Sequence, residues 1–562
     1  MARVGRHSAA PSMKACMPLS FASVTAPVKA SLQELRTLLL PDPEPLDYPF
    51  APDDVAQLHR LHADPGAAAL DDTTWKDLLL GPYLAQLSPE LSIFGQQMLH
   101  HRLRAGMDDG GRDALGERVR EHMRDPVRLR QLRSACHALR AVDTEVAGLL
   151  FADDAPPARS AWAGKCWLLL AALLVSLGAV LLTPFAYLGA GLALFTLMSM
   201  QVRYGPRIEA WNRKLKSLQL MLRVDSELGT RDEAPLAGFV PAAAQSGRLN
   251  HSLSRSWVGG VTPGARAYSD WFMLANLEHY WKCVALVHGQ RDFLRAAFLR
   301  CAGLEADLAL ARHLLQTPSA CWADRGGAAE LALDGAVHPL MAQAQPLTFR
   351  LHGKGAFISG RNGIGKSTLL RTIGLNLVAA RAFGFCYAAG ARVPQLPVYA
   401  SMQSEDSLFG GESLYMAELR RARELLAAAD GPHPGVYLID EIFRGTNHLE
   451  SVSAAAAVLD ALAAKGMVIV SSHNLVLAPL LAHRLAPWCV AADAHAMLTL
   501  APGVLSQTNG IALLGARGLG QELEANAGRV YDWLSGYLAR PADCSHVLGG
   551  AGASDEAAGI VD

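Results

Sequence analysis

The stretch Gly360-Arg361-Asn362-Gly363-Ile364-Gly365-Lys366-Ser367-Thr368 decides the fold of the C-terminal part of this 562-residue chain. It fits the pattern G-x-x-x-x-G-K-[ST] and lies between an apolar run and an apolar segment with helical spacing. This strand–loop–helix context is what a phosphate-binding loop requires. The glycines let backbone N–H groups turn inward around phosphates, and the following helix N-terminus adds partial positive charge. We predict that all nine residues bind the phosphates of ATP.

The polar residues of this loop have separate expected roles. Lys366 should reach the β- and γ-phosphates and act in catalysis, and Ser367 should ligate Mg²⁺. The apolar run Val436–Ile439 ends in Asp440 and Glu441, 74 residues after Lys366. We predict that Asp440 completes the Mg²⁺ shell and that Glu441 orients or deprotonates the attacking water. The cofactors implied are therefore ATP and Mg²⁺.

A histidine ends another apolar run in the same region. His473 follows Val468–Ser472, whose composition predicts a β-strand. Ligands of open α/β sheets bind beyond the carboxyl ends of the strands, so we expect His473 to sense the γ-phosphate. A purely structural histidine at a strand end is the alternative.

From Leu347 onward, short apolar runs alternate with helical segments. This βα pattern predicts a parallel sheet with helices on its faces. The expected strands include Phe357–Ser359, Pro397–Ala400, Val436–Ile439 and Met467–Ser471.

Six segments in this region, in family order, resemble the ATPase domain of the MutS DNA mismatch-repair family. They are Gly335–Leu340, Gly360–Thr368, Ser401–Leu419, Asp440–Thr446, Ser471–Asn474 and Thr508–Ile511. The resemblance implies an ATPase that works as a homodimer. In that family, the residue matching Ser413 faces the γ-phosphate of the partner subunit, Arg444 lies at the dimer interface, and Asn362 lies near the nucleotide.

The upstream residues are expected to be mostly helical. Pro126 should divide the long apolar stripe of Glu117–Leu150 into two helices. Gly95–Leu103 and Arg118–Leu132 resemble the helical lever of the MutS family, which implies DNA as a partner and a role in mismatch repair. The chain has no F-x-E motif of the type carried by the mismatch-reading domain. It therefore resembles membrane-type MutS-related proteins that lack this domain.

An uncharged run of 37 residues, Cys166–Val202, interrupts the helical part. A spanning helix needs about 20 apolar residues, and Thr183-Pro184 lies near the middle of the run, where a turn is expected. We predict a transmembrane hairpin formed by Trp162–Leu182 and Phe185–Val202. The basic flanks place both ends in the cytoplasm. This implies membrane lipid as a partner and a cytoplasmic-membrane location. A buried hairpin in a protein core is the alternative.

Composition limits the remaining function classes. Only 18% of the residues are charged, and the formal net charge is -1, so any DNA contact must use a local basic patch. Arg128, Arg130 and Arg133 form one such patch, for which a solvated helix face is the simpler interpretation. The nine cysteines contain no C-x-x-C pair, which argues against a zinc site or a disulfide framework.

The predicted fold is multidomain, with an α-helical lever and core region, a transmembrane hairpin and an α/β P-loop ATPase domain. The expected parts are a disordered tail (1–30), lever-like helices (31–160), the hairpin (161–203), a helical return (204–334), the ATPase (335–540) and a flexible tail (541–562).

Two alternative functions stay open. One is an ABC-transporter-type ATPase, although the 45 residues between Lys366 and Gly411 leave little room for its helical subdomain. The other is a membrane scaffold without hydrolysis or a DNA role. The intact Lys366, Ser367, Asp440 and Glu441 argue against it.

Overall fold

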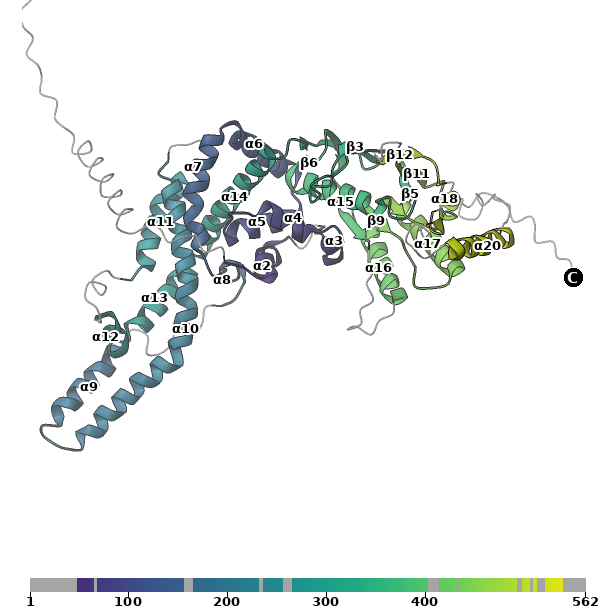
Figure 1. Ribbon diagram of the computed structural model, residues 1–562. Helices are drawn as coiled ribbons and strands as arrows, with labels where there is room; N and C mark the ends of the chain where they lie inside the picture. Colours follow the sequence, from purple (N-terminus) through teal and green to yellow (C-terminus); the bar gives the residue numbers. More distant parts are fainter. Residues whose placement is uncertain are drawn as a thin grey trace, which may run out of the picture. The chain divides into compact units, whose positions relative to one another are not determined.

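The computed structural model describes residues 48–64, 68–155, 165–231, 236–255, 265–402, 414–432, 434–492, 498–505, 509–512 and 521–538. The two tails expected at 1–30 and 541–562 lie outside these ranges. A helical region comes first in the chain, and an α/β region follows it (Figure 1).

The helical region consists of thirteen α-helices and one 3-10 helix among the described residues. They are α2 (Pro52–His62), α3 (Asp72–Asp77), α4 (Leu80–Leu87), α5 (Ile93–Ala105), α6 (Asp109–Arg124), α7 (Pro126–Cys136), the 3-10 helix η1 (His137–Ala141), α8 (Ala147–Phe151), α9 (Trp167–Ala179), α10 (Ala186–Leu228), α11 (Val240–Leu253), α12 (Ala265–Phe272), α13 (Ala275–Gly289) and α14 (Arg291–Leu315).

Polar side chains set the starts of several of these helices. Asp125 accepts hydrogen bonds from the N–H groups of Val127 and Arg128, and Pro126 occupies the first turn of α7. A proline in the first turn needs no intrahelical N–H bond, so it starts a helix where it would break one further along. The prediction that Pro126 separates two helices is confirmed.

The expected hairpin exists, but its assignment to a membrane is wrong. Helices α9 and α10 lie side by side and are connected around Thr183-Pro184 (Figure 1). Helix α9 has 13 residues, about 20 Å at 1.5 Å per residue, against about 30 Å of hydrocarbon. Helix α10 is longer, but it runs on through Gln201 and Arg203 into charged sequence. Among the described residues, no helix combines the length and apolarity needed to cross a membrane.

The predictions of membrane lipid as a partner and of a cytoplasmic-membrane location fail with it. One face of the hairpin belongs to a packed core instead. Leu173 of α9 and Leu197 of α10 are buried in a cluster with Leu277 and Trp281 of α13. Part of the apolar run therefore packs against protein, but the hairpin is not the fully buried one of the alternative interpretation, since many of its large side chains are exposed.

The α/β region contains three sheets among the described residues. The largest has the strand order β12-β11-β5-β10-β9-β8, parallel except for β12. Smaller sheets pair β1 with β6 and order β2-β7-β3-β4. The strands are β1 (Cys321–Trp322), β2 (Asp324–Gly326), β3 (Glu330–Ala336), β4 (Leu347–His352), β5 (Gly355–Gly360), β6 (Phe385–Cys386), β7 (Gly390–Pro394), β8 (Val398–Ser401), β9 (Val436–Asp440), β10 (Met467–Ser471), β11 (Leu485–Ala492) and β12 (Leu498–Pro502).

Five helices follow or separate these strands in the part of the region that the structure describes. They are α15 (Lys366–Phe383), α16 (Leu414–Ala429), α17 (His448–Ala463), α18 (Leu477–Leu480) and α20 (Gln521–Leu538). The predicted parallel sheet with alternating helices is confirmed. All four strands expected from the sequence are present as β5, β8, β9 and β10.

The central strands are buried on both faces because their side chains alternate between two cores. Ile358 and Leu438 pack in the cluster that contains α15 and the helical region, whereas Phe357 and Ile439 pack with α16 and α17. Successive residues of a strand point to opposite faces, so a short continuous apolar run suits a strand covered on both sides.

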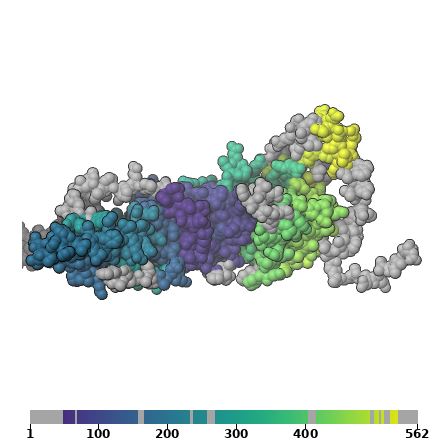
Figure 2. Space-filling model, turned by 90° about the horizontal axis from the view of Figure 1, so that it is seen from below, coloured from purple at the N-terminus to yellow at the C-terminus, as the bar shows by residue number. Residues whose placement is uncertain are grey.

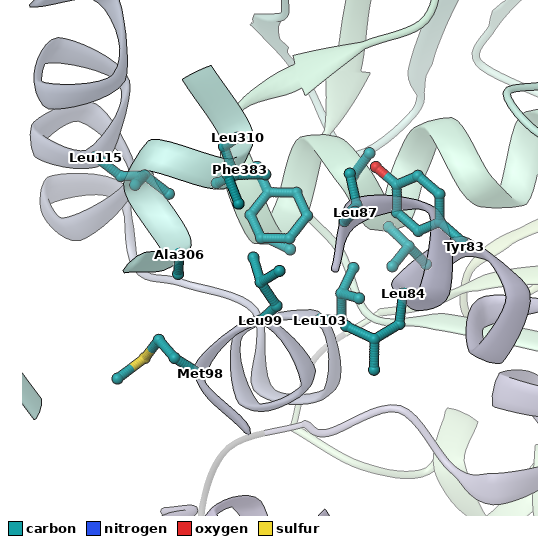
Figure 3. Packing of buried hydrophobic residues seen from close by; sticks show 14 of the residues in the cluster. Tyr83, Leu84, Leu87, Met98, Leu99, Leu103, Leu115, Ala306, Leu310 and Phe383 are labelled. Atoms are coloured by element: carbon teal, nitrogen blue, oxygen red, sulfur yellow. The ribbon is translucent and has the colours of Figure 1, made fainter. Parts of the chain in front are cut away.

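The helical and α/β regions share one hydrophobic cluster. Figure 3 shows Phe383 of α15 beside Leu310 of α14 and Leu99 of α5. The surface view in Figure 2 also shows the first helices (purple) adjoining the α/β region (green). Helix α3 contacts the edge strand β8, where Thr74 Oγ1 accepts from the N–H of Ala400 at 2.9 Å and Asp77 Oδ2 accepts from that of Met402 at 2.8 Å. The helical region thus covers an otherwise unpaired sheet edge.

Candidate nucleotide-binding site

The phosphate-binding loop connects β5, whose six residues are all buried, to the N-terminus of α15. Gly363 and Gly365 have φ values of 75° and 102°, a left-handed region that glycine enters without steric cost. A side chain at Gly360 would meet the carbonyl oxygen of Val490 at 2.9 Å. The glycines of the pattern are therefore required by backbone conformation and by space.

Lys366 is buried at the start of α15, with 6% of its surface exposed. Its Nζ donates to the carbonyl oxygens of Gly360 at 3.2 Å and Arg361 at 3.4 Å, and lies 3.4 Å from His473 Nε2. The ammonium group therefore lies across its own loop, next to the end of β10. Ser367 and Thr368 are partly exposed in the first turn of the same helix.

Strand register aligns the acidic residues with this loop. Asp440, the last residue of β9, pairs with Ser471 of β10, and Ser471 pairs with Ile358 of β5. The Ser471 hydroxyl donates to Asp440 Oδ1. Since Ile358 precedes Gly360 by two residues, Asp440 and the phosphate loop lie at the same carboxyl edge of the sheet.

The Glu441 carboxylate lies between the imidazole of His473 and the guanidinium group of Arg444. Its Oε1 lies 3.0 Å from His473 Nε2, and its Oε2 lies 3.4 Å from Arg444 Nη1. The backbone of Glu441 has a φ of 58°, an uncommon value outside glycine, and its N–H donates to the Ser471 carbonyl at 2.9 Å. Such strained positions cluster at functional sites.

The electrostatics of the site follow from its partial burial. Burial lowers the pKa of Lys366, while Glu441 and Asp440 act in the opposite direction. Burial also lowers the pKa of His473, with nearby Lys366 adding to the effect and Glu441 opposing it. A lowered pKa favours a neutral imidazole at pH 7, which can accept or donate a hydrogen bond without adding charge.

Comparison with known proteins identifies this region. Residues 356–521 match the family model for MutS domain V. This part of the chain, called domain V below, is similar to MutS domain V, and the chain is related to MutS-family proteins.

Three relatives illustrate the extent of the likeness. The chain is 32% identical over 177 residues to a DNA mismatch repair protein MutS of Thermus aquaticus, covering 30% of this chain and 22% of that protein. It is 36% identical over 143 residues to an endonuclease MutS2 of Thermus thermophilus, covering 25% and 19%. It is 30% identical over 283 residues to a DNA mismatch repair protein MutS of Rhodopseudomonas palustris, covering 47% and 31%. The chain thus matches between 19% and 31% of the length of these three relatives.

A buried carboxylate supports the loop that carries Glu441 in domain V. Glu418 of α16 accepts hydrogen bonds from the N–H groups of Arg444 at 3.1 Å and Gly445 at 3.2 Å. A side chain at Gly445 would lie 2.6 Å from the N atom of Tyr415, so this position also needs glycine. Glu418 belongs to the segment Ser401–Leu419 that resembles the family, but its contact with the Asp440–Thr446 segment is visible only in three dimensions.

Further polar contacts join the phosphate loop of domain V to the segment near its end. The Asn509 side-chain oxygen accepts from the N–H of Asn362 at 2.9 Å. Ser359 Oγ accepts from the N–H of Leu505 at 2.9 Å and donates to the Trp488 carbonyl at 3.1 Å. The motif match at Thr508–Ile511 pointed to this neighbourhood, whereas Ser359 carries no motif signal and was missed. Ser471 lies in a matching segment, but nothing in the sequence assigned it a contact with Asp440.

The predicted site residues are thus largely brought together. Lys366, His473, Glu441 and Asp440 converge at the carboxyl edge of the sheet, beside the loop Gly360–Gly365. Ser413 and Thr508 lie outside the residues that the structure describes. The roles assigned to all these residues remain predictions.

A Mg²⁺ site at Ser367 and Asp440 fits the chemistry of the donors. Mg²⁺ prefers oxygen ligands and is usually held by one or two protein oxygens together with waters and substrate phosphates. Asp440 is a carboxylate at 8% exposure, and its Oδ1 is oriented by the Ser471 hydroxyl. Within the described ranges, no group of three or more His, Cys, Asp or Glu side chains could hold a metal by itself. A nucleotide-dependent ion is consistent with both observations.

The basic row predicted on α7 is partly neutralised by neighbouring groups. Arg128 Nη1 lies 3.9 Å from Glu121 Oε1, and Arg133 forms an ion pair with Glu90. Arg130 donates from Nε to the Pro126 carbonyl at 3.3 Å. The three arginines thus do not present a uniform cationic face.

Proposed function

We propose that this chain binds ATP with Mg²⁺ and hydrolyses it at the carboxyl edge of the large sheet. One observation carries the proposal: the connected contacts Lys366–His473–Glu441–Arg444, with separations of 3.4, 3.0 and 3.4 Å. They place a phosphate-binding cation, a polar strand-end histidine and a carboxylate beside one glycine-rich loop. This is the combination that positions a phosphoryl group and its attacking water.

Each residue has a defined task in this proposal. The Lys366 ammonium turns from the carbonyls of Gly360 and Arg361 to the β- and γ-phosphates, which offer stronger charge-assisted bonds. Glu441 orients a water molecule and accepts its proton, while His473 and Arg444 hold the carboxylate in place. Ser367 and Asp440 hold Mg²⁺, which when bound neutralises charge that develops on the phosphate oxygens. The N–H groups of Gly363–Gly365 surround the phosphates.

The direct test is Glu441→Gln in the full-length chain. The amide keeps the shape of the side chain but cannot accept the proton of water, so turnover should fall about 100-fold or more with ATP binding retained. Steady-state phosphate release and binding of a fluorescent ATP analogue measure the two quantities separately. Glu424→Gln on α16, an exposed carboxylate away from the loop, is the matched control. Normal turnover of Glu441→Gln would remove Glu441 from the proposed role.

We further propose that the active form is a homodimer with composite sites, as the resemblance of Ser413 and Arg444–Asn447 to interface residues suggests. Chains with Lys366→Ala mixed with chains with Ser413→Ala should regain part of the activity, because a mixed dimer contains one intact site. Sedimentation of Glu441→Gln at saturating ATP should show a dimer. A monomer under these conditions contradicts the dimer but leaves the hydrolysis test untouched.

DNA is the proposed partner, supported by relatives that are named DNA mismatch repair proteins. The net charge of -1 and the partly paired arginines of α7 argue for binding through a few phosphate contacts. Anisotropy titrations with homoduplex, mismatched and branched DNA should therefore show an affinity that falls with rising salt and little preference for a mismatch. A many-fold preference for mismatched DNA would show that the chain recognises mismatches, contrary to this expectation.

A further inference from the structure

A cavity of about 310 Å³ lies in the helical region, away from the nucleotide site. Its wall is formed by the connection between α4 and α5, by α7 with η1, and by α14. The volume is at the lower end of the range of about 300–1,000 Å³ that small-molecule sites occupy. The cavity is therefore large enough for a small ligand and too restricted for a folded partner.

Four arginines line this cavity. Arg130 and Arg133 come from successive turns of α7, Arg140 from η1 and Arg312 from α14. On α14, the positions Glu305, Ala309 and Arg312 face the cavity, whereas Ala306 and Leu310 pack into the core shown in Figure 3. This division follows the 3.6-residue period of a helix. Packing of Ala306 and Leu310 in the core thus orients α14 so that Arg312 lies in the cavity wall.

Two carboxyl groups face these four arginines. Glu90 pairs with Arg133 and also lies 3.5 Å from Arg312 Nη1, so one carboxylate joins two guanidinium groups. Its backbone φ of 63° is uncommon for a residue other than glycine. Glu90 therefore holds a strained conformation at the cavity rim, with its carboxylate between two arginines.

The second carboxyl group, that of Glu305, lies in the wall of the cavity. Glu305 is buried, and it accepts hydrogen bonds from the Ser92 hydroxyl and from the Ser92 N–H at 3.2 Å. Burial raises the pKa of Glu305 to about 7, while the bonds from Ser92 act in the opposite direction. Four guanidinium groups thus face two carboxyl groups, so the cavity wall carries an excess of positive charge.

We propose that this cavity binds a small phosphate-bearing anion through Arg130, Arg133, Arg140 and Arg312, which displaces the Glu90 carboxylate from two of them. Guanidinium groups match phosphate oxygens in a planar, bidentate geometry, and several of them together suit a ligand with two or more negative charges. A carboxylate already occupies part of this arrangement and shows that anionic oxygens fit there. The proposal is independent of ATP hydrolysis at domain V.

The experiment is calorimetric titration of inorganic pyrophosphate into the full-length Lys366→Ala chain, in which the phosphate loop no longer competes for the probe. One binding site is expected. Arg312→Gln and Arg133→Gln should each weaken binding about tenfold or more. Arg128→Gln on the same helix but outside the cavity should leave the affinity unchanged. Glu90→Gln should tighten binding several-fold because it removes the competing carboxylate, a change that structural damage cannot produce.

Arg130→Gln is a second variant, at the exposed rim, where a change in folding is least expected. Thermal melting of each variant establishes that it is folded. The proposal is wrong if pyrophosphate does not bind the Lys366→Ala chain. It is also wrong if adding Arg312→Gln or Arg130→Gln to that chain leaves the affinity for pyrophosphate unchanged. It is also wrong if a short DNA duplex without terminal phosphates displaces pyrophosphate with comparable affinity, because the arginines then form a nucleic-acid contact.

Discussion

Strand β9 and the α9–α10 hairpin are both apolar in sequence, yet the structure treats them differently. All five residues of β9 are buried. In the hairpin, Leu181, Leu182 and Phe185 are 90%, 86% and 79% exposed. The difference lies in what covers each segment, because β9 is enclosed by helices on both faces, whereas the hairpin is packed only along its inner face. An apolar run therefore predicts burial only when its partners are also known.

The largest effect should come from the nucleotide site. Lys366→Ala removes a buried ammonium that compensates phosphate charge, and ATP binding should weaken about 1,000-fold, roughly 4 kcal/mol. Equilibrium binding of a fluorescent ATP analogue measures this loss. Lys354→Ala is the control, since that lysine is exposed and donates to the Ala482 carbonyl away from the loop. An affinity within a few-fold of wild type for Lys366→Ala would contradict the assignment of the loop.

A pair of identical substitutions tests the comparison directly. Leu438→Ala in β9 removes a fully buried side chain and should lower the free energy of unfolding by about 3 kcal/mol. Leu181→Ala at the tip of the hairpin removes a side chain that is 90% exposed and should change it by less than about 0.5 kcal/mol. Urea titrations of both variants measure these two changes in the free energy of unfolding. A large loss for Leu181→Ala would mean that the hairpin tip is covered in solution.

The sequence allowed the arrangement of the candidate nucleotide site to be predicted because its determinants are local. Glycines at fixed spacing impose the loop, and parallel strands bring their carboxyl ends to one edge, so Lys366, Asp440 and His473 could be placed without a structure. The turn at Thr183-Pro184 and the break at Pro126 are also local signals.

The features that could not be predicted depend on contacts between distant residues. Ser471 orients Asp440 through strand pairing, and Glu418 reaches its two N–H donors from a different helix. The membrane prediction failed for the same reason. Packing of Leu173 and Leu197 against α13 cannot be read from the composition of residues 166–202. The short length of α9 likewise emerged only from the structure.

Glu418 offers a test of whether its hydrogen bonds to the loop that carries Glu441 matter for turnover, although Glu418 itself lies outside that loop. Glu418→Gln replaces an acceptor by an amide that presents a donor to Arg444 N–H or Gly445 N–H, at a cost of about 1–3 kcal/mol. We expect turnover to fall about tenfold while the ATP dissociation constant stays unchanged. Phosphate release measures turnover, and binding of a fluorescent ATP analogue measures the dissociation constant. Glu424→Gln on the same helix is the control. Equal losses in binding and turnover would indicate a general disruption of domain V.

The last expected effect concerns pH and the helical region. Burial lowers the pKa of His100 to about 3, with Arg104 and neighbouring histidines adding to the shift. The unfolded chain, with a histidine pKa near 6.5, therefore binds a proton that the folded chain rejects, and stability is lost as pH falls below about 6.5. Glu305, whose pKa is raised to about 7, acts in the opposite direction, so the comparison must be made between variants.

His100→Gln removes this titration. Between pH 6.5 and 4 the dependence of unfolding free energy on pH should become shallower by up to about 1.4 kcal/mol per pH unit. Urea titrations at several pH values measure the slope. His352→Gln, at an exposed position in β4, should keep the wild-type slope. His100 packs against Trp75 at 4.7 Å between ring centroids, so the substitution also changes the stability at neutral pH. The free energy of unfolding at each pH is therefore compared with that of the same variant at pH 7.5. Parallel slopes for His100→Gln and wild type would mean that the pKa of His100 is the same in the folded and the unfolded chain, contrary to this expectation.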